Sequence, residues 1–264
     1  MRKFYAIILT ILLLASTACE LKLSQYGDDT KSTLIEVQRY DRLESRYLTT
    51  GDFSALQQMN IDYAKETRML IENVLRIGEV NDPEINSKFL KFYQDTILQT
   101  IIADVETQYV NMDDINQQLS DAFARLQKEL PDLTLPKVYA QIGALDQSII
   151  IGENSIGISL DKYLGADYHI YSNYYPKEQR QMMNRSSIVP DCLSFYLLSL
   201  YPLQNYAKST QMQRDKHMGK VMWAVNKLMK RKVFNTQYTK EVEALAKRHP
   251  HLAVTDILAS DKIK

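Results

Sequence analysis

The sequence predicts an α+β fold that is mostly helical with a small central antiparallel sheet, and three observations support this class. Apolar residues recur at helical spacing in four segments between residues 34 and 130. Three short β-branched segments follow between residues 137 and 160. Helical patterns then resume after residue 176. Helices, a small group of strands and further helices are typical of one α+β domain, which we expect over residues 32–264.

The first residues carry the pattern of a cleavable secretory signal. Arg2 and Lys3 precede an apolar stretch over residues 4–15, and small residues then lead to Cys19. A positive start, a short apolar core and small residues before the cleavage point are typical of such a signal. The apolar stretch is shorter than the ~20 residues that a membrane-spanning helix needs. We therefore expect residues 1–18 to be a signal peptide.

The cysteine at the cleavage point predicts a lipoprotein. Ala18 suits cleavage directly before Cys19, whose acylation would anchor the mature chain, with the polar residues 19–31 as a tether. Ser16 stands where this motif usually has leucine, so cleavage that leaves Cys19 as a free thiol stays an alternative. We favour lipidation of Cys19, because an unpaired N-terminal thiol is a liability in an oxidising compartment.

Four helical patterns precede the strands. The third begins at Asp82-Pro83-Glu84, where a capping aspartate, a proline at the first helical position and an acidic first turn favour a helix start. The four patterns predict helices over residues 34–47, 56–77, 82–105 and 113–130.

The second half of the chain begins with short strands. Turn residues separate three β-branched runs, which predict strands over residues 137–143, 148–152 and 155–160. Four further segments then have helical character, over residues 176–183, 188–201, 209–232 and 240–249.

Composition and charge exclude some classes of function. The chain is 45% hydrophobic and 24% charged, as expected of a folded protein. Loss of Arg2 and Lys3 with the signal leaves 30 basic against 32 acidic residues, a net charge of about −2. Nothing in this balance favours nucleic acid as a partner. Cys192 lies in an apolar run, which predicts a small buried hydrophobe rather than a nucleophile.

The sequence shows no catalytic motif. A zinc peptidase helix needs two histidines one turn apart, as in H-E-x-x-H, and no two of the four histidines have that spacing. G-x-S-x-G, the P-loop and the dinucleotide fingerprint are also missing from the sequence. We therefore expect a protein that is not an enzyme, with no metal site and no cofactor.

One segment, residues 159–175, stands out by its tyrosines. Asp161 is expected to cap a one-turn helix, and Gly165 to end it with a positive φ. Tyr168, Tyr171 and their neighbours follow in a loop. Tyrosine suits half-buried positions where the ring packs and the hydroxyl meets water or a partner. The loop is therefore either a well-packed cover of the sheet or a binding surface.

The same segment carries a family resemblance. The string Leu160-Asp161-Lys162-Tyr163-Leu164-Gly165-Ala166-Asp167 follows two strands and precedes a proline-started helix and the string IVPD at residues 188–191. Over residues 131–202 this order resembles the gliding-motility lipoprotein B (GldB-like) family of Bacteroidetes. The C-terminal part is shorter and more basic than is usual in that family. The resemblance implies an envelope lipoprotein needed for surface motility.

The family's architecture is also similar to that of zincin-like (peptidase MA-like) proteins. In such proteins the helix after the sheet carries H-E-x-x-H. Here that helix contains Asp191 and Cys192 and has no histidine. The resemblance therefore implies a degenerate zincin-like architecture without the metal.

These observations predict a non-enzymatic envelope lipoprotein that binds an envelope protein or helps to assemble a gliding-type apparatus. Its lipid anchor is expected in the outer rather than the inner membrane, on the periplasmic face. The candidate binding surface comprises Leu160, Asp161, Tyr163, Leu164, Gly165, Asp167, Tyr168, Tyr171 and Asp191. The alternative is a periplasmic hydrolase, peptidase-like or glycan-acting, with Asp161, Asp167, His169 or Asp191 as acid or base. A receptor for a soluble ligand is a third possibility, and it predicts an enclosed apolar pocket.

Overall fold

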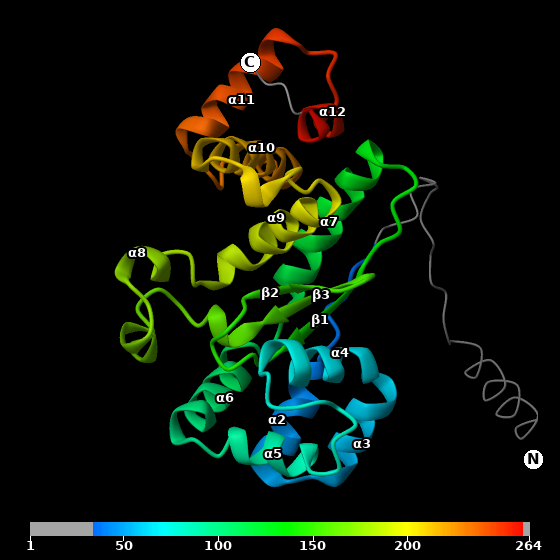
Figure 1. The fold of residues 1–264 in the computed structure, drawn as a ribbon, viewed down its shortest axis with the longest axis vertical. Coiled ribbons are helices and arrows are strands. Elements are labelled where there is room, and N and C mark those ends of the chain that lie inside the picture. Colours follow the sequence, from blue (N-terminus) through cyan, green and yellow to red (C-terminus); the bar gives the residue numbers. More distant parts are fainter. Residues whose placement is uncertain (1–33, 261–264) are drawn as a thin grey trace, which may run out of the picture. The chain divides into compact units, whose positions relative to one another are not determined.

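The fold confirms the α+β class, with helices on both sides of a three-stranded sheet (Figure 1). The computed structural model describes residues 34–260, which lie in a single unit spanning residues 32–264. The predicted signal peptide, Cys19 and the whole of the predicted tether over residues 19–31 lie outside the described residues. Across residues 34–260, none of the helices combines the length and the apolar character that crossing a bilayer requires.

The sheet is mixed, which corrects the prediction of an antiparallel one. Strand order is β1 (Lys137–Gln141), β3 (Ser155–Ser159), β2 (Ile149–Ile151). β2 and β3 form the expected antiparallel pair, but β3 lies between the other two strands and runs parallel to β1. Turn residues at positions 152–154 specify the β2–β3 hairpin. Nothing local in the sequence specifies which neighbour β1 takes.

The described residues before α2 (Tyr40–Thr50), residues 34–39, stay outside a helix because Gln38 pairs with β1. The Gln38 N–H donates to the Val138 carbonyl over 2.8 Å, and the Ala140 N–H donates to the Gln38 carbonyl over 2.9 Å. Farther back, the Ile35 N–H donates to Ser120 Oγ over 2.9 Å. α2, the first helix within the described residues, therefore begins later than its apolar pattern predicts.

Two of the predicted N-terminal helices are each divided into shorter ones. The second pattern becomes α3 (Phe53–Asp62), α4 (Ala64–Arg68) and a π-helical turn (Met69–Val74). The third becomes α5 (Ile85–Phe92) and α6 (Thr96–Gln108), because Asp95 caps α6 by accepting from two backbone N–H groups. The fourth, α7 (Asp113–Glu129), is confirmed as one helix.

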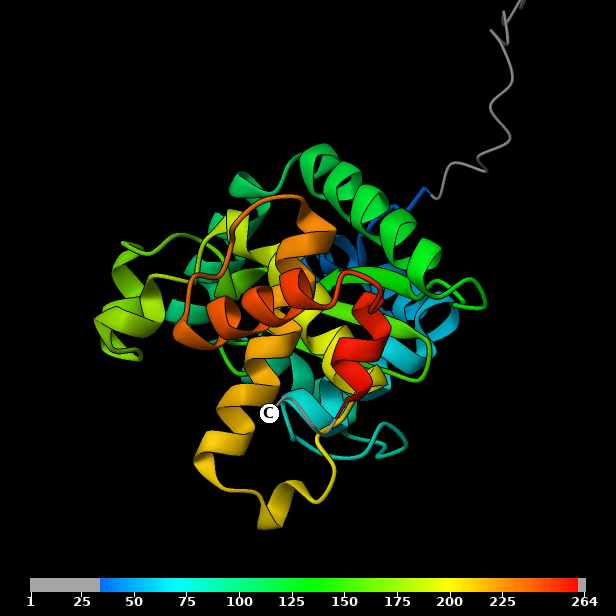
Figure 2. The same ribbon diagram turned by 90° about the horizontal axis from the view of Figure 1, so that it is seen from above.

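The C-terminal half contains the predicted helices in the predicted order. They are α8 (Lys177–Arg180), α9 (Ile188–Leu200), α10 (Gln211–Met229) and α11 (Gln237–Arg248), and a short α12 (Val254–Ala259) was not predicted. α9 packs on β2 and β3, α10 packs on α7 and α9, and α11 lies across α10 (Figure 2). Cys192 is fully buried on α9, as predicted.

Candidate functional site

A buried carboxylate of the family string holds a turn that lies far from it in the sequence. Asp161, within the one-turn helix η3 (Leu160–Lys162), accepts from the Gly143 N–H over 2.7 Å and from the Leu145 N–H over 2.5 Å. It does not cap the helix, contrary to the prediction, because both of its oxygens face the turn after β1. Gly165 does adopt the predicted positive φ, at 123°.

The turn that Asp161 holds has an unfavourable backbone conformation. Ala144 has φ 51° and Leu145 has φ 64°, and the Asp146 N–H closes the turn on the Gly143 carbonyl over 3.1 Å. Left-handed conformation at a non-glycine residue costs about 1–2 kcal/mol. Two such residues in a row show that tertiary contacts, rather than local preference, determine this turn.

Replacing Ala144 with glycine should therefore stabilise the protein by about 0.5–1 kcal/mol, because relief of the left-handed strain exceeds the entropy that glycine loses on folding. Urea unfolding would measure the change. A matched control is Ala103→Gly at an exposed position inside α6, which should destabilise by about 1 kcal/mol. A loss of stability in both variants would contradict the strain argument.

A second buried carboxylate supports the residue before this turn. Glu44 on α2 accepts from the Ile142 N–H over 2.8 Å, while the Tyr93 hydroxyl donates to the Ile142 carbonyl over 2.6 Å. Burial raises the pKa of Glu44 well above its ordinary value, and burial likewise raises the pKa of Asp161. Two buried acids therefore hold residues 142–145 in place.

The tyrosines and Lys162 complete this scaffold. Tyr171 donates from its hydroxyl to the Asp161 carbonyl and accepts from the Leu164 N–H over 2.9 Å. Tyr109 donates to the Tyr163 carbonyl over 2.6 Å. Lys162 donates to the Leu145 and Asp146 carbonyls and to the Tyr175 hydroxyl. The rings pack while the hydroxyls satisfy buried backbone groups, so the segment is a packed structural unit.

The predicted surface residues consequently separate into two groups. Five are buried, namely Leu160, Asp161, Tyr163, Leu164 and Tyr171. Asp167 is exposed, while Gly165, Tyr168 and Asp191 are partly exposed, and the Tyr168 hydroxyl donates to Asp104 over 2.6 Å. Only this second group and its neighbours can meet a partner without a change of fold.

Asp191 lies in a cleft of about 360 Å³ beside the start of β2. The Tyr163 hydroxyl donates to Asp191 Oδ2 over 2.8 Å. Burial raises the pKa of Asp191 to about 6, against the opposing effect of this hydrogen bond. Asp146, Ser148, Lys162, Tyr163, Met182 and Phe195 are among the lining residues. The cleft therefore places a poorly solvated carboxylate within reach of a ligand.

The four acid or base candidates of the hydrolase alternative do not meet in this cleft. Asp191 alone among them lines it. Asp161 has both oxygens on backbone N–H groups in the core, and Asp167 and His169 are exposed in the following loop. Within residues 34–260, no group of three or more His, Cys, Asp and Glu side chains is placed to hold a metal ion.

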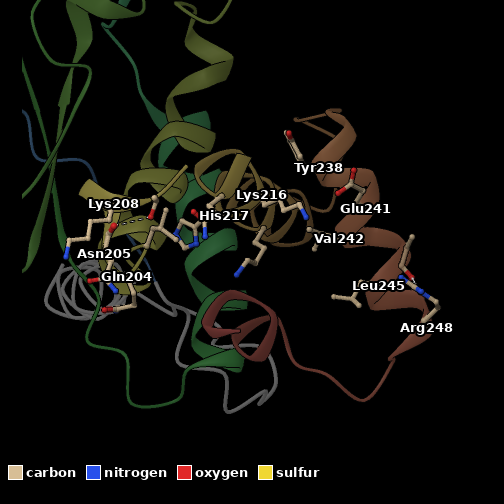
Figure 3. Close-up of a pocket in the computed structure, with 15 residues that line it drawn as sticks. Gln204, Asn205, Lys208, Lys216, His217, Tyr238, Glu241, Val242, Leu245 and Arg248 are labelled. Atoms are coloured by element: carbon tan, nitrogen blue, oxygen red, sulfur yellow. Dashed lines mark hydrogen bonds between the residues drawn. The ribbon is translucent and has the colours of Figure 1, made fainter. Parts of the chain in front are cut away.

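A second region, for which no role was predicted, lies on the C-terminal helices. A groove of about 570 Å³ runs between α10, α11 and residues 203–209. Figure 3 shows Lys216 and His217 of α10 between the loop residues Gln204 to Lys208 and the α11 residues Val242 and Leu245. The titratable residues of the lining are Lys208, Lys216, His217, Lys220, Arg248, Tyr238 and one acid, Glu241.

A neighbouring groove of about 630 Å³ is also basic. It is lined by Trp223 and by the cations Lys227, Lys230, Arg231, Lys232, Lys240 and Lys247. Its acid is Glu243, which accepts from Trp223 Nε1 over 2.7 Å and pairs with Lys227 and Lys247 over 3.5 and 3.7 Å. Two basic grooves with partly apolar walls therefore adjoin the packed pair α10 and α11.

The positive charge of the C-terminal helices does not show in the net charge of the whole chain. Residues 203–260 contain 11 Lys and Arg against 4 Asp and Glu, whereas residues 34–202 contain 15 against 24. The opposite excesses nearly cancel in the total. A count over separate blocks of the sequence, rather than over the whole chain, could have identified the C-terminal helices as a candidate surface.

Comparison with known proteins agrees with the motif. The family model described as gliding motility protein GldB matches residues 24–251. Comparison with curated proteins and with solved structures gives no match. The matched range covers far more than half of the chain and includes the buried scaffold, the Asp191 cleft and both basic grooves. The chain therefore belongs to the family of gliding motility protein GldB, a lipoprotein family associated with the cell envelope.

Proposed function

We propose that this protein is a non-enzymatic binding component of a gliding-type envelope apparatus, and that its C-terminal helices bind an acidic surface of a partner protein. A lipid on Cys19 would hold it at the periplasmic face of the outer membrane. The observation that carries the proposal is the segregation of charge: 11 basic against 4 acidic residues over residues 203–260, around two grooves.

The chemistry of the grooves favours a protein surface as the ligand. Their walls combine long cationic side chains with apolar groups such as Leu203, Val242, Leu245 and Trp223. Apolar contacts provide anchoring area, and the cations select an acidic partner and speed its approach. A chain located in the envelope would not meet nucleic acid, which also presents negative charge.

A charge-reversal variant tests this proposal. Arg231, Lys232 and Lys240 are exposed around the second groove, and we would replace all three with glutamate. A control with the same change of net charge is Lys65, Lys91 and Lys177 to glutamate, three exposed residues outside the basic stretch over residues 203–260. Membranes of the source cells would be crosslinked with each variant, and the bound proteins quantified by mass spectrometry.

We expect the groove variant to recover at least tenfold less of an acidic envelope partner after crosslinking. Colonies that carry this variant should lose surface spreading, whereas the control variant should keep both the partner and the spreading. Raised salt should weaken the same interaction, since it screens charges. A Cys19→Ala arm should bind the partner in the soluble fraction, which separates binding from tethering. Recovery of equal amounts of the partner by both triple variants would refute the proposal. Binding of the purified protein to anionic lipid vesicles, with no protein partner recovered from the membranes, would refute it too.

A further inference from the structure

β2 is an edge strand of the sheet and pairs with β3 on one side only. The Ser159 N–H donates to the Ser148 carbonyl, and the Gly152 N–H donates to the Ser155 carbonyl. Antiparallel pairing alternates, so these bonds place the N–H and C=O groups of residues 148, 150 and 152 toward β3. The corresponding groups of Ile149 and Ile151 then point away from the sheet. Within residues 34–260, they have no hydrogen-bond partner.

The other edge of the sheet is partly covered. Gln38 forms a bridge with Tyr139 of β1 and covers part of that strand. The β2 edge is therefore a place in the described sheet where an added strand would find unpaired backbone groups. Exposed sheet edges commonly bind extended peptides by strand addition. Proteins that do not use an edge for binding usually shield it.

The Asp191 cleft adjoins the same edge. Ile149 lines it together with Ser148, and two apolar side chains, Met182 and Phe195, remain 43% and 41% exposed in the free protein. Asp191 and Asp146 contribute two carboxylates against one cation, Lys162. The Lys162 ammonium already donates to two carbonyls and a tyrosine hydroxyl. The cleft thus has an apolar rim and a net negative interior.

We propose that β2 and this cleft form a binding site for an extended peptide segment that adds a strand along Ile149–Ile151 and inserts a lysine or arginine side chain toward Asp191. Backbone hydrogen bonds to the β2 edge would align the segment. The aliphatic part of the inserted side chain would pack on Met182 and Phe195, and its charged end would reach the carboxylate. This site goes beyond the proposed function, because it lies apart from the C-terminal grooves and prefers the opposite charge.

Two capped pentapeptides serve as probes. One has the order threonine, valine, lysine, valine, threonine, and the other has glutamate in the centre. Titration of the ¹⁵N-labelled protein, followed through its amide resonances, should show the lysine peptide binding at least tenfold more tightly. The shifts should concentrate at Ile149, Ile151 and Asp191.

Variants of the two halves of the site test each separately. Ile151→Pro removes an outward N–H while it leaves the bonds to β3, and proline is tolerated on edge strands, so binding should fall at least tenfold. Asp191→Asn should abolish the preference for lysine over glutamate. Asp167→Asn, an exposed carboxamide substitution in the same half of the chain, should change neither.

If Ile151→Pro does not fold, a lysine peptide with methylated backbone nitrogens tests pairing with β2 on the unaltered protein. Methylation removes the peptide's N–H donors, so this peptide should bind at least tenfold more weakly. Absence of binding by the lysine peptide up to millimolar concentration would overturn the inference. Binding that survives backbone methylation and Asp191→Asn would overturn it too. The Arg231, Lys232 and Lys240 variant should bind the peptide normally, so failure of the proposed function would not produce failure here.

Discussion

Replacing Asp161 with alanine should lower the free energy of unfolding by about 3–5 kcal/mol, measured by urea denaturation. The substitution leaves the N–H groups of Gly143 and Leu145 without their carboxylate acceptor. A donor that loses its buried partner costs about 1–3 kcal/mol, and here there are two. The left-handed conformations of Ala144 and Leu145 would also lose the contact that maintains them.

The same string contains a matched control. Asp167→Ala removes an exposed carboxylate six positions later and should change stability by less than about 0.5 kcal/mol. Asp161→Asn should fall between the two, because the amide keeps one oxygen acceptor but turns an NH₂ group toward a backbone donor. Equal small effects for Asp161→Ala and Asp167→Ala would contradict the structural role of Asp161.

Replacing Asp191 with asparagine should stabilise the protein at pH 8, by about 2–3 kcal/mol, and have little effect near pH 4. Burial raises the pKa of Asp191 to about 6, above the value of ~3.9 for an unfolded aspartate. Between these values the folded protein holds a proton that the unfolded chain has released. The contribution of Asp191 to the free energy of unfolding therefore falls as pH rises from about 4 to about 6 and is constant above.

Asparagine removes this dependence, so the difference between wild type and variant should grow across that pH window. Tyr163→Phe provides the complementary test, because the Tyr163 hydrogen bond lowers the pKa of Asp191. Without it, the loss of stability should extend above pH 6. A stability difference between the wild type and the Asp191→Asn variant that is constant from pH 4 to pH 8 would contradict the shifted pKa. A carboxylate that destabilises the fold is commonly retained for function.

Local patterns were sufficient for most helices and all three strands. The apolar pattern over residues 113–130 predicted α7 as one helix. The three β-branched runs predicted β1, β2 and β3, with bounds that differ by only a few residues from those in the structure. The break between α5 and α6 could have been predicted from Asp95, because an aspartate directly before a helical stretch is a capping signal. The late start of α2 could not, since it depends on pairing with β1.

The candidate site could be predicted only in part from the sequence. Tyr163 and Asp191, which the motif names, are joined by a hydrogen bond and both line the cleft. The motif did not show that Asp161 faces Gly143 and Leu145, 16–18 positions away. Nor did it show that the tyrosines mainly support buried backbone, because a ring and a hydroxyl fit a surface and a core equally well.

By itself the sequence determined the family, the α+β class and the order of the elements, because side-chain periodicity and turn residues act over a few positions. Tertiary structure alone decided the parallel β1–β3 pairing and the placement of the unpaired β2 edge beside Asp191. These features depend on which distant segments come together. Their energies come from hydrogen bonds and burial across long separations, which no local window of sequence records.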